Sequence, residues 1–332
     1  MGTVTAGTDA PLSLPAHVPD MANALAAPPV VYALALVPAL LWGFSPVLSK
    51  RGMAAGGTSL QASLAVVVVD SALFLVALAV LQGGDAFAGL TTEAIGVFVL
   101  AGVFGTALGR LATFTGVDRV GASVNSAGIS ARPLFATMLA VLFLGEAASL
   151  STAVGIVVLV GGLAALALAK GGDISGWEPY ELLFPVAAAG FFAVGNVLRR
   201  YGLTSSDVTS LEAVALNELA ALVVLFGYAV ARGRVSEVLG SPKETWGYFA
   251  ASGTITAVAL LSLFAAFAHP EGTVAIVDPL AATAPLFTTV FAYFLLGDLE
   301  RVTRGVVLGA ALVVLGVALV TAGPALLAPL GL

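Results

Sequence analysis

The sequence consists mostly of apolar runs of about twenty residues, separated by short polar stretches. About twenty residues of α-helix cross the roughly 30 Å of hydrocarbon in a bilayer, so each run predicts a membrane helix. Only 10% of the residues are charged, whereas a soluble domain carries roughly 25%. Such a chain cannot cover a globule with polar surface, and we expect lipid to surround most of it.

The runs predict an all-α integral membrane fold with about ten transmembrane helices. The connections are too short for a soluble domain, and a multi-pass location in the cell membrane is expected. Residues 1–29 are rich in Ala, Pro and Thr and lack the basic start of a signal peptide, which predicts a disordered tail. The expected helices are 31–49, 60–82, 94–116, 120–144, 150–169, 182–201, 210–231, 246–268, 273–296 and 303–323.

The two halves of the chain, 30–170 and 178–324, resemble each other. Segment 132–146 is identical to segment 284–298 at seven of fifteen positions, including Pro-Leu-Phe and Leu-Gly. Five helices per copy is an odd number, so the second copy enters the bilayer from the opposite side. This predicts an inverted-topology repeat, which in many secondary transporters places the solute site near the bilayer midplane.

The sequence LWGFSP at 41–46, followed by the two Pro-Leu-Phe helices with their Leu-Gly-acid turns, resembles the drug/metabolite transporter superfamily, EamA branch, over roughly residues 31 to 324. The resemblance implies a ten-helix exporter or exchanger of small metabolites. It also implies a cavity lined by helices 1, 3, 4, 6, 8 and 9, with helices 5 and 10 at the periphery. Related small multidrug-resistance proteins carry a proton-binding glutamate in the first helix, whereas residues 40–47 contain no acid.

Charged residues inside the spans are the candidates for function, because a charge in hydrocarbon costs about 2.5–3.5 kcal/mol even on lenient scales. Arg132 lies near the centre of the fourth helix, on one face with Asn125. Pro133 removes a backbone donor beside it and exposes carbonyl groups. We expect Arg132 and Asn125 to bind an anionic or hydrogen-bonding solute. Alternatively, Arg132 pairs with a carboxylate and only holds helices together.

Three further residues are candidates for the cavity wall. Asp278 is the acidic counterpart on the ninth helix, and it could meet the arginines as a substrate clamp, a coupling site or a plain salt bridge. Arg110 shares a face with Thr106 on the third helix, although it could instead extend to the interface. Trp42, at the middle of the first helix, provides either a stacking surface for a solute or simple packing.

Asp70 and Glu218 lie well inside the second and seventh helices. No basic residue lies within a turn of Asp70, and a lone buried carboxylate can carry a proton. We therefore consider both acids for proton coupling. The alternatives are a neutral, hydrogen-bonded acid or a pair with an arginine elsewhere in the fold.

Other chemistry is not expected. The chain has no cysteine, and His17 and His269 lie far apart, so we predict no metal site and no cofactor. No enzyme motif is present, and the net charge of −6 with no basic block gives no reason to expect nucleic acid. Glu146 and Asp298 are interpreted as turn and cap groups. The expected partners are a small-molecule substrate and the lipid bilayer, and a homodimer is left open.

The orientation and the function each leave an alternative. Most loop lysines and arginines fall on one side of this topology, and only Arg199 and Arg200 fall on the other. Because basic loops favour the cytoplasm, this count puts both termini outside. The family resemblance instead puts both termini in the cytoplasm. The favoured function is secondary transport by alternating access. The alternative is a non-transporting scaffold or receptor, which requires that no cavity remain and that four charged residues all be paired: Asp70, Arg110, Arg132 and Asp278.

Overall fold

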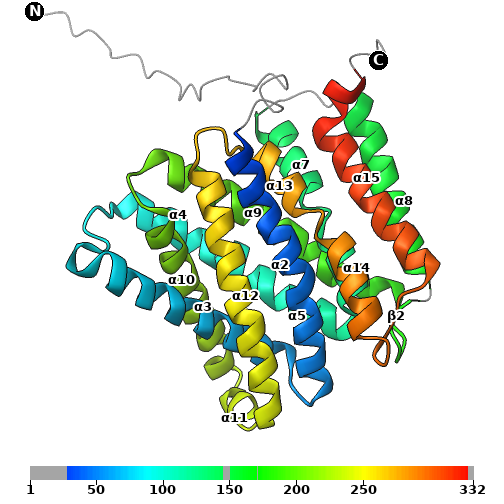
Figure 1. The fold of residues 1–332 in the computed structure, drawn as a ribbon, viewed down its shortest axis with the longest axis horizontal. Coiled ribbons are helices and arrows are strands. Elements are labelled where there is room, and N and C mark those ends of the chain that lie inside the picture. Colours follow the sequence, from blue (N-terminus) through cyan, green and yellow to red (C-terminus); the bar gives the residue numbers. More distant parts are fainter. Residues whose placement is uncertain (1–27, 145–149, 170, 328–332) are drawn as a thin grey trace, which may run out of the picture.

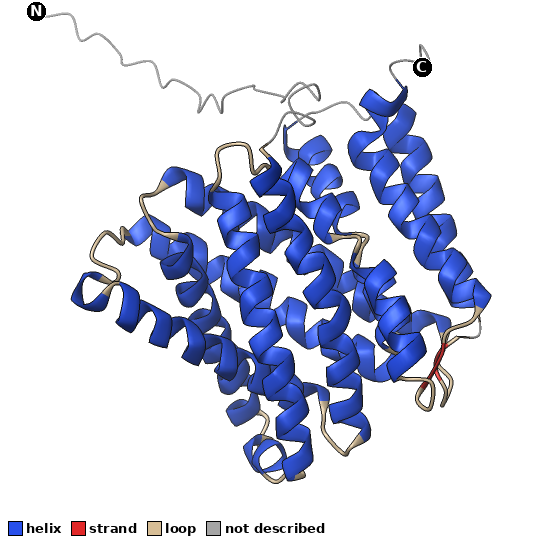
Figure 2. Ribbon diagram, viewed as in Figure 1, coloured by secondary structure: helices blue, strands red, loops and turns tan. Residues whose placement is uncertain are grey.

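The protein is described by a computed structural model covering residues 28–144, 150–169 and 171–327. Within these ranges it is almost entirely helical (Figure 2). The first half contains α2 (Pro29–Ala54), α3 (Ser59–Leu81), η1 (Gly83–Asp85), α4 (Thr92–Gly102), the π-helical turn η2 (Val103–Leu108), α5 (Gly109–Val120), α6 (Ala122–Ile129), α7 (Arg132–Leu144) and α8 (Leu150–Leu168). The predicted tail and Glu146 lie outside the described residues, apart from the last two positions of the tail.

The second half contains η3 (Pro179–Leu182), α9 (Leu183–Ser205), α10 (Ser210–Ala231), α11 (Val235–Leu239), α12 (Lys243–Ala268), α13 (Val274–Ala281), α14 (Ala284–Leu295) and α15 (Arg304–Leu327). Strands β1 (Gly172–Asp173) and β2 (Glu300–Arg301) form a short antiparallel pair in which Gly172 lies opposite Arg301. Threonine side chains at 58, 91 and 209 accept backbone N–H groups and so fix where α3, α4 and α10 begin.

Seven helices or helix runs in the described ranges are long and apolar enough to cross a membrane, so the protein is a multi-pass membrane protein. Two shorter apolar helices, Val154–Leu166 and Arg304–Leu319, add to them. The seven are Pro29–Ala54, Ser59–Leu81, Thr92–Val120, Pro179–Ser205, Ser210–Ala231, Lys243–Ala268 and Ile276–Leu295.

The fourth and ninth predicted helices are not continuous, which corrects the sequence prediction. The first is interrupted between α6 and α7 and the second between α13 and α14, at equivalent positions of the two repeats. Pro133 and Pro285, which follow these breaks, have no N–H to donate one turn back, so the helical ladder is open there. The two breaks lie against each other, because the Ser130 hydroxyl donates to the Ala282 carbonyl at 2.7 Å.

Helices α2 and α9, the first long helix of each half, run in opposite directions. The end of α2 lies beside β1, the strand that precedes α9, since Lys50 pairs with Asp173. The end of α9 lies beside the end of α12, where Arg200 donates to the carbonyl of His269 at 2.8 Å, and α12 runs antiparallel to α2 (Figure 1). Thus α2 and α9 cross the bundle in opposite senses.

The packing of one half is repeated by the other. Helix α2 packs on α12 and α14, and α9 packs in the same way on α4–η2–α5 and on α6–α7. Helices α8 and α15 pack chiefly on each other and stand at one edge of the bundle (Figure 1). The centre of the bundle is therefore enclosed by the other helices of both halves.

The start of α6 is held by the buried carboxylate of Glu300 in β2. Its oxygens accept the N–H groups of Ala122 and Ser123 and the Ser123 hydroxyl, which leaves α6 capped from the other half of the chain. Burial raises the pKa of Glu300, and these hydrogen bonds only partly offset it. Asp298, in the turn after α14, pairs with Arg51 at 2.6 Å at the protein surface.

Candidate functional site

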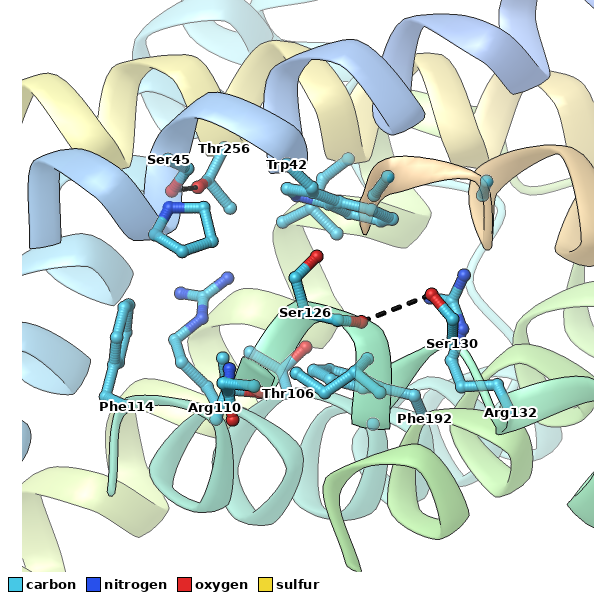
Figure 3. A pocket seen from close by; sticks show the side chains of 18 of the residues that line it. Trp42, Ser45, Thr106, Arg110, Phe114, Ser126, Ser130, Arg132, Phe192 and Thr256 are labelled. Carbon is cyan, nitrogen blue, oxygen red and sulfur yellow. Dashed lines mark hydrogen bonds between the residues drawn. The ribbon is translucent and has the colours of Figure 1, made fainter. Parts of the chain in front are cut away.

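A cavity lies at the centre of the bundle, between the two halves (Figure 3). Its volume of about 110 Å³ is enough for several waters or a small solute. The wall comes from α2, η2–α5, α6–α7, α9, α12 and α13–α14, which correspond to the six helices that the resemblance implies. The polar side chains in the wall are Ser45, Thr106, Arg110, Thr113, Asn125, Ser126, Ser130, Arg132, Arg199 and Thr256.

The charge of this wall is one-sided. Three arginines contribute to it, and no aspartate or glutamate among the described residues does. Figure 3 shows Arg110 at one end of the cavity and Arg132 at the other, with Trp42 and Ser126 between them. A low-dielectric cavity with guanidinium groups in its wall attracts an anion more strongly than the same groups would in water.

Arg132 is the first residue of α7 and is only 4% exposed. Its guanidinium carbon lies 5.9 Å from the ring centre of Trp42 and 6.0 Å from that of Phe192, so the cation is flanked by two aromatic faces. Its nearest described carboxylate oxygen belongs to Asp278, at 3.9 Å from Nη2. The Nε atom of Arg132 is buried and has no hydrogen-bond partner in the described parts of the chain.

Asp278 is placed behind Arg132 rather than in the cavity wall. Its Oδ1 accepts a hydrogen bond of 2.6 Å from the Asn196 side chain, and it is 1% exposed. The acid of one half and the arginine of the other therefore meet across the interface between the repeats. Asp278 holds Arg132 loosely and is shielded from the cavity.

Asn125 and Trp42 both line the cavity. Asn125 is fully buried on α6, and within the described ranges neither its amide nitrogen nor its oxygen has a hydrogen-bond partner. Buried polar atoms normally find a partner, and those that do not are places where water or a ligand is expected.

Arg110 is 7% exposed and does not extend to the membrane interface. Its Nη1 lies 2.9 Å from Oδ2 of Asp70 on α3 and 3.2 Å from Oε2 of Glu218 on α10. Asp70 therefore lies at ion-pair distance from an arginine of another helix. Both acids bind the same guanidinium nitrogen.

Arg199 is the residue that sequence analysis placed wrongly. It was counted with Arg200 among the loop charges on one side of the topology, but its side chain, on α9, is buried in the core of the bundle with 2% exposure. Its nitrogens donate to Asn217 at 3.2 Å, to Asn196 at 2.7 Å and to Thr106 at 2.9 Å. The spacing of Asn196 and Arg199 by three residues, one helix face, is the signal that could have identified it.

These contacts join into one buried polar network that crosses the interface between the repeats. It connects the carboxylate pair around Arg110 with the Arg132 end of the cavity by way of Arg199. Groups of three or more His, Asp or Glu placed to hold a metal ion are absent from the described ranges. The members of the network are Asp70, Arg110, Glu218, Thr106, Asn217, Arg199, Asn196, Asp278 and Arg132.

Comparison with known proteins agrees with this architecture. The EamA-like transporter family matches residues 30–168 and 180–322. An uncharacterized transporter of Clostridium kluyveri is 29% identical over 126 residues, which cover 38% of this chain and 40% of the relative's length. A protein of known crystal structure shares the fold with a TM-score of 0.60 at 18% identity, covering 88% of this chain and 96% of its own. Because the family matches both halves of the chain, this protein belongs to the EamA-like transporter family, membrane transporters of the drug/metabolite superfamily.

Proposed function

We propose that the protein is a secondary transporter of the cell membrane that exports or exchanges a small metabolite by alternating access. In this proposal ten spans form two inverted five-helix repeats, and the solute binds in the cavity between them. The observation that carries it is the cavity itself. Both repeats enclose it, and its described wall residues include arginines and no carboxylate.

The scaffold or receptor alternative required that the four charged residues named for it all be paired and that no cavity remain. The first condition is met in the structure, since Asp70, Arg110, Arg132 and Asp278 all have charged partners. The second condition is not met. A solute site therefore explains the geometry better than a purely structural network does.

The chemistry of the wall favours a small carboxylate or another anion. Arg132 offers a buried donor without a described hydrogen-bond partner, and Asn125 offers one donor and one acceptor. Trp42 and Phe192 provide apolar faces beside the cation. We propose that the anionic group binds Arg132 and displaces Asp278 as its counter-ion, that Asn125 binds a second polar group, and that Arg110 and Trp42 complete the wall.

The broken helices give the proposed motion its hinges. Each break leaves backbone groups outside a regular ladder, and the Ser130–Ala282 contact is a single hydrogen bond between them. Because the breaks belong to opposite repeats, rocking one repeat against the other would change their contact while the helices remain intact.

Transport in proteoliposomes tests the proposal. Purified protein is reconstituted and uptake of radiolabelled small carboxylates, zwitterions, neutral sugars and cations is measured, with Arg132→Ala and the surface control Arg51→Ala beside wild type. We expect wild type to take up at least one carboxylate. Arg132→Ala should lower this uptake by about 10-fold or more, because a charge-assisted hydrogen bond contributes about 1.5–3 kcal/mol. Arg51→Ala should leave the uptake unchanged.

Two outcomes would contradict different parts of the proposal. Wild-type uptake that Arg132→Ala leaves unchanged would exclude Arg132 as the binding residue. If no compound in any class were taken up by protein that elutes as a single folded species, the transporter assignment itself would lose its support. Arg132→Lys, which keeps the charge but not the fork of donors, separates the need for a cation from the need for its geometry.

A further inference from the structure

Two buried carboxylates share one cation in this protein. Asp70, Arg110 and Glu218 come from three different helices, and both acids are 0% exposed. A single atom, Nη1 of Arg110, lies 2.9 Å from Asp70 and 3.2 Å from Glu218. The two acids are thus held around the same positive charge, away from solvent.

The hydrogen-bond donors around the pair are too few for two anions. Oε1 of Glu218 accepts from Thr106 at 3.1 Å and from Asn217 at 3.0 Å. Its Oε2 atom and both oxygens of Asp70 have no hydrogen-bond partner among the described residues. An ionised carboxylate that is removed from water needs both a counter-charge and donors, and Asp70 has only its share of Arg110.

The neighbouring charges do not supply the missing cation directly. From α9, Arg199 donates to the hydroxyl of Thr106, which in turn donates to Glu218. Asp278 of α13 and Arg132 of α7 lie farther along the same network, beyond Asn196. Helix α12 also packs on α3, but its charged residues, at positions 243 and 244, lie in its first turn.

We propose that Asp70 and Glu218 hold one proton between them and that this proton is the coupling ion of the transporter, which rests on the function proposed above. Two carboxylates that face one cation in a dry site titrate as a coupled pair, because the single cation balances the charge of only one of them.

The position of Arg110 gives the coupling its sign. The same guanidinium contributes to the cavity wall and to the carboxylate pair. An anion bound in the cavity draws positive charge away from Asp70 and Glu218, so solute binding favours proton uptake. By thermodynamic reciprocity, the bound proton favours the anion to the same extent. Proton and anionic solute therefore bind, and cross, together.

Infrared difference spectroscopy tests the proton site without any solute. The protein in lipid is titrated from about pH 5 to about pH 9, a range that includes documented buried acids, and the C=O stretching band of protonated carboxyl groups is followed. We expect one titrating band in wild type. In Asp70→Asn and in Glu218→Gln, Arg110 keeps a single carboxylate as partner, and the band disappears from this range. Asp278→Asn, a matched change of a buried acid outside the pair, leaves the band in place.

Isotope labelling covers the case in which a variant does not fold. Wild-type protein made with ¹³C-carboxyl aspartate or glutamate shows a shifted band only if the labelled residue type carries the proton. The absence of any titrating carboxyl band in wild type would overturn the proposal, as would a band that persists in both Asp70→Asn and Glu218→Gln.

The transport assay then tests the coupling. An imposed pH gradient should drive uptake by wild type, whereas Asp70→Asn should carry the solute down its own gradient without response to pH. Wild-type uptake that ignores the pH gradient would overturn the coupling and leave the transporter assignment standing. A carboxyl band without any uptake would contradict the transporter assignment and leave the proton site standing.

Discussion

Arg199 shows how this protein keeps a positive charge in its core. All three of its hydrogen-bonding contacts with described residues are to neutral oxygens, those of Asn196, Asn217 and Thr106. These satisfy the geometry of the guanidinium without cancelling its charge. Within the described ranges no carboxylate lies at ion-pair distance from it. The cavity therefore keeps an electrostatic preference for anions even though its other two arginines have acidic partners.

The Lys50–Asp173 pair at the end of α2 makes stability depend on pH. Burial raises the pKa of Asp173, but hydrogen bonds from Lys50 and Ser175 outweigh it and hold the pKa below its ordinary value of 3.8. A carboxylate whose pKa is lower in the folded protein stabilises the fold at pH values above 3.8, and this contribution is lost as the pH falls through the lowered pKa.

We therefore expect the thermal midpoint of wild type in detergent to exceed that of Asp173→Asn at neutral pH by about 2 °C, since such a pair contributes about 1 kcal/mol. The difference should shrink below about pH 4. Differential scanning fluorimetry at several pH values measures it, with Asp298→Asn, at an exposed ion pair, as the control. A difference between wild type and Asp173→Asn that is constant with pH would contradict the assigned role of the pair.

Sequence analysis identified many of the buried charges but not the partners of Asp70 and Glu218. Asp70 and Glu218 stood out because acids are rare in apolar runs, and Arg110 for the same reason. One nitrogen of Arg110 binds both acids because of the way α3, α5 and α10 pack. The local spacing of residues in the sequence does not encode this packing. Arg199 was misplaced because a charge near the end of an apolar run is usually at the interface.

At the scale of helices, the sequence predicted where the ladders weaken but not that they break. Pro133 and Pro285 mark the positions, and a proline inside a helix often produces only a kink. Here each break is stabilised by contacts from the other half, such as Ser130 with Ala282, and these tertiary contacts are invisible in the sequence. The apolar pattern itself was sufficient to predict the helices around them.

Two glycines allow the repeats to approach closely where α9 crosses η2. A Cβ atom on Gly195 of α9 would lie 2.4 Å from the Cα of Gly105 in η2, so only glycine allows the helices to cross at this distance. This crossing places Arg199 of α9 within reach of Thr106.

Gly195→Ala should therefore lower stability by about 1–3 kcal/mol, the usual cost of overpacking. Gly227→Ala, in α10 with no atom within 4 Å of the new methyl group, should change it little. Thermal unfolding in detergent compares the two variants. Equal midpoints for Gly195→Ala and Gly227→Ala would show that the helices can separate without cost.

At the scale of the whole molecule, the architecture is symmetric and the chemistry is not. Alignment of 132–146 with 284–298 places Ala284 opposite Arg132 and Ser126 opposite Asp278. Equivalent helices pack on each other in both halves, yet the second repeat has no arginine at the position of Arg132. At these two positions of the polar network the halves therefore differ in chemistry, although their helices pack in a similar arrangement.

The proposed inverted arrangement predicts which loops lie on the same side of the membrane. Ala54 at the end of α2 and Ser175 beside β1 lie at one end of the bundle, linked by the Lys50–Asp173 pair, and Ser205 at the end of α9 lies at the other. The chain has no cysteine, so a single introduced cysteine gives a signal without background.

In intact cells, a membrane-impermeant maleimide should label either Ala54→Cys and Ser175→Cys together or Ser205→Cys alone, because α2 and α9 cross in opposite directions. Labelling of Ala54→Cys and Ser205→Cys from the same side would exclude the inverted repeat. The expected pattern would also show on which side of the membrane the termini lie, where the loop-charge count and the family resemblance disagree. Permeabilised cells, in which all three cysteines should react, provide the control for accessibility.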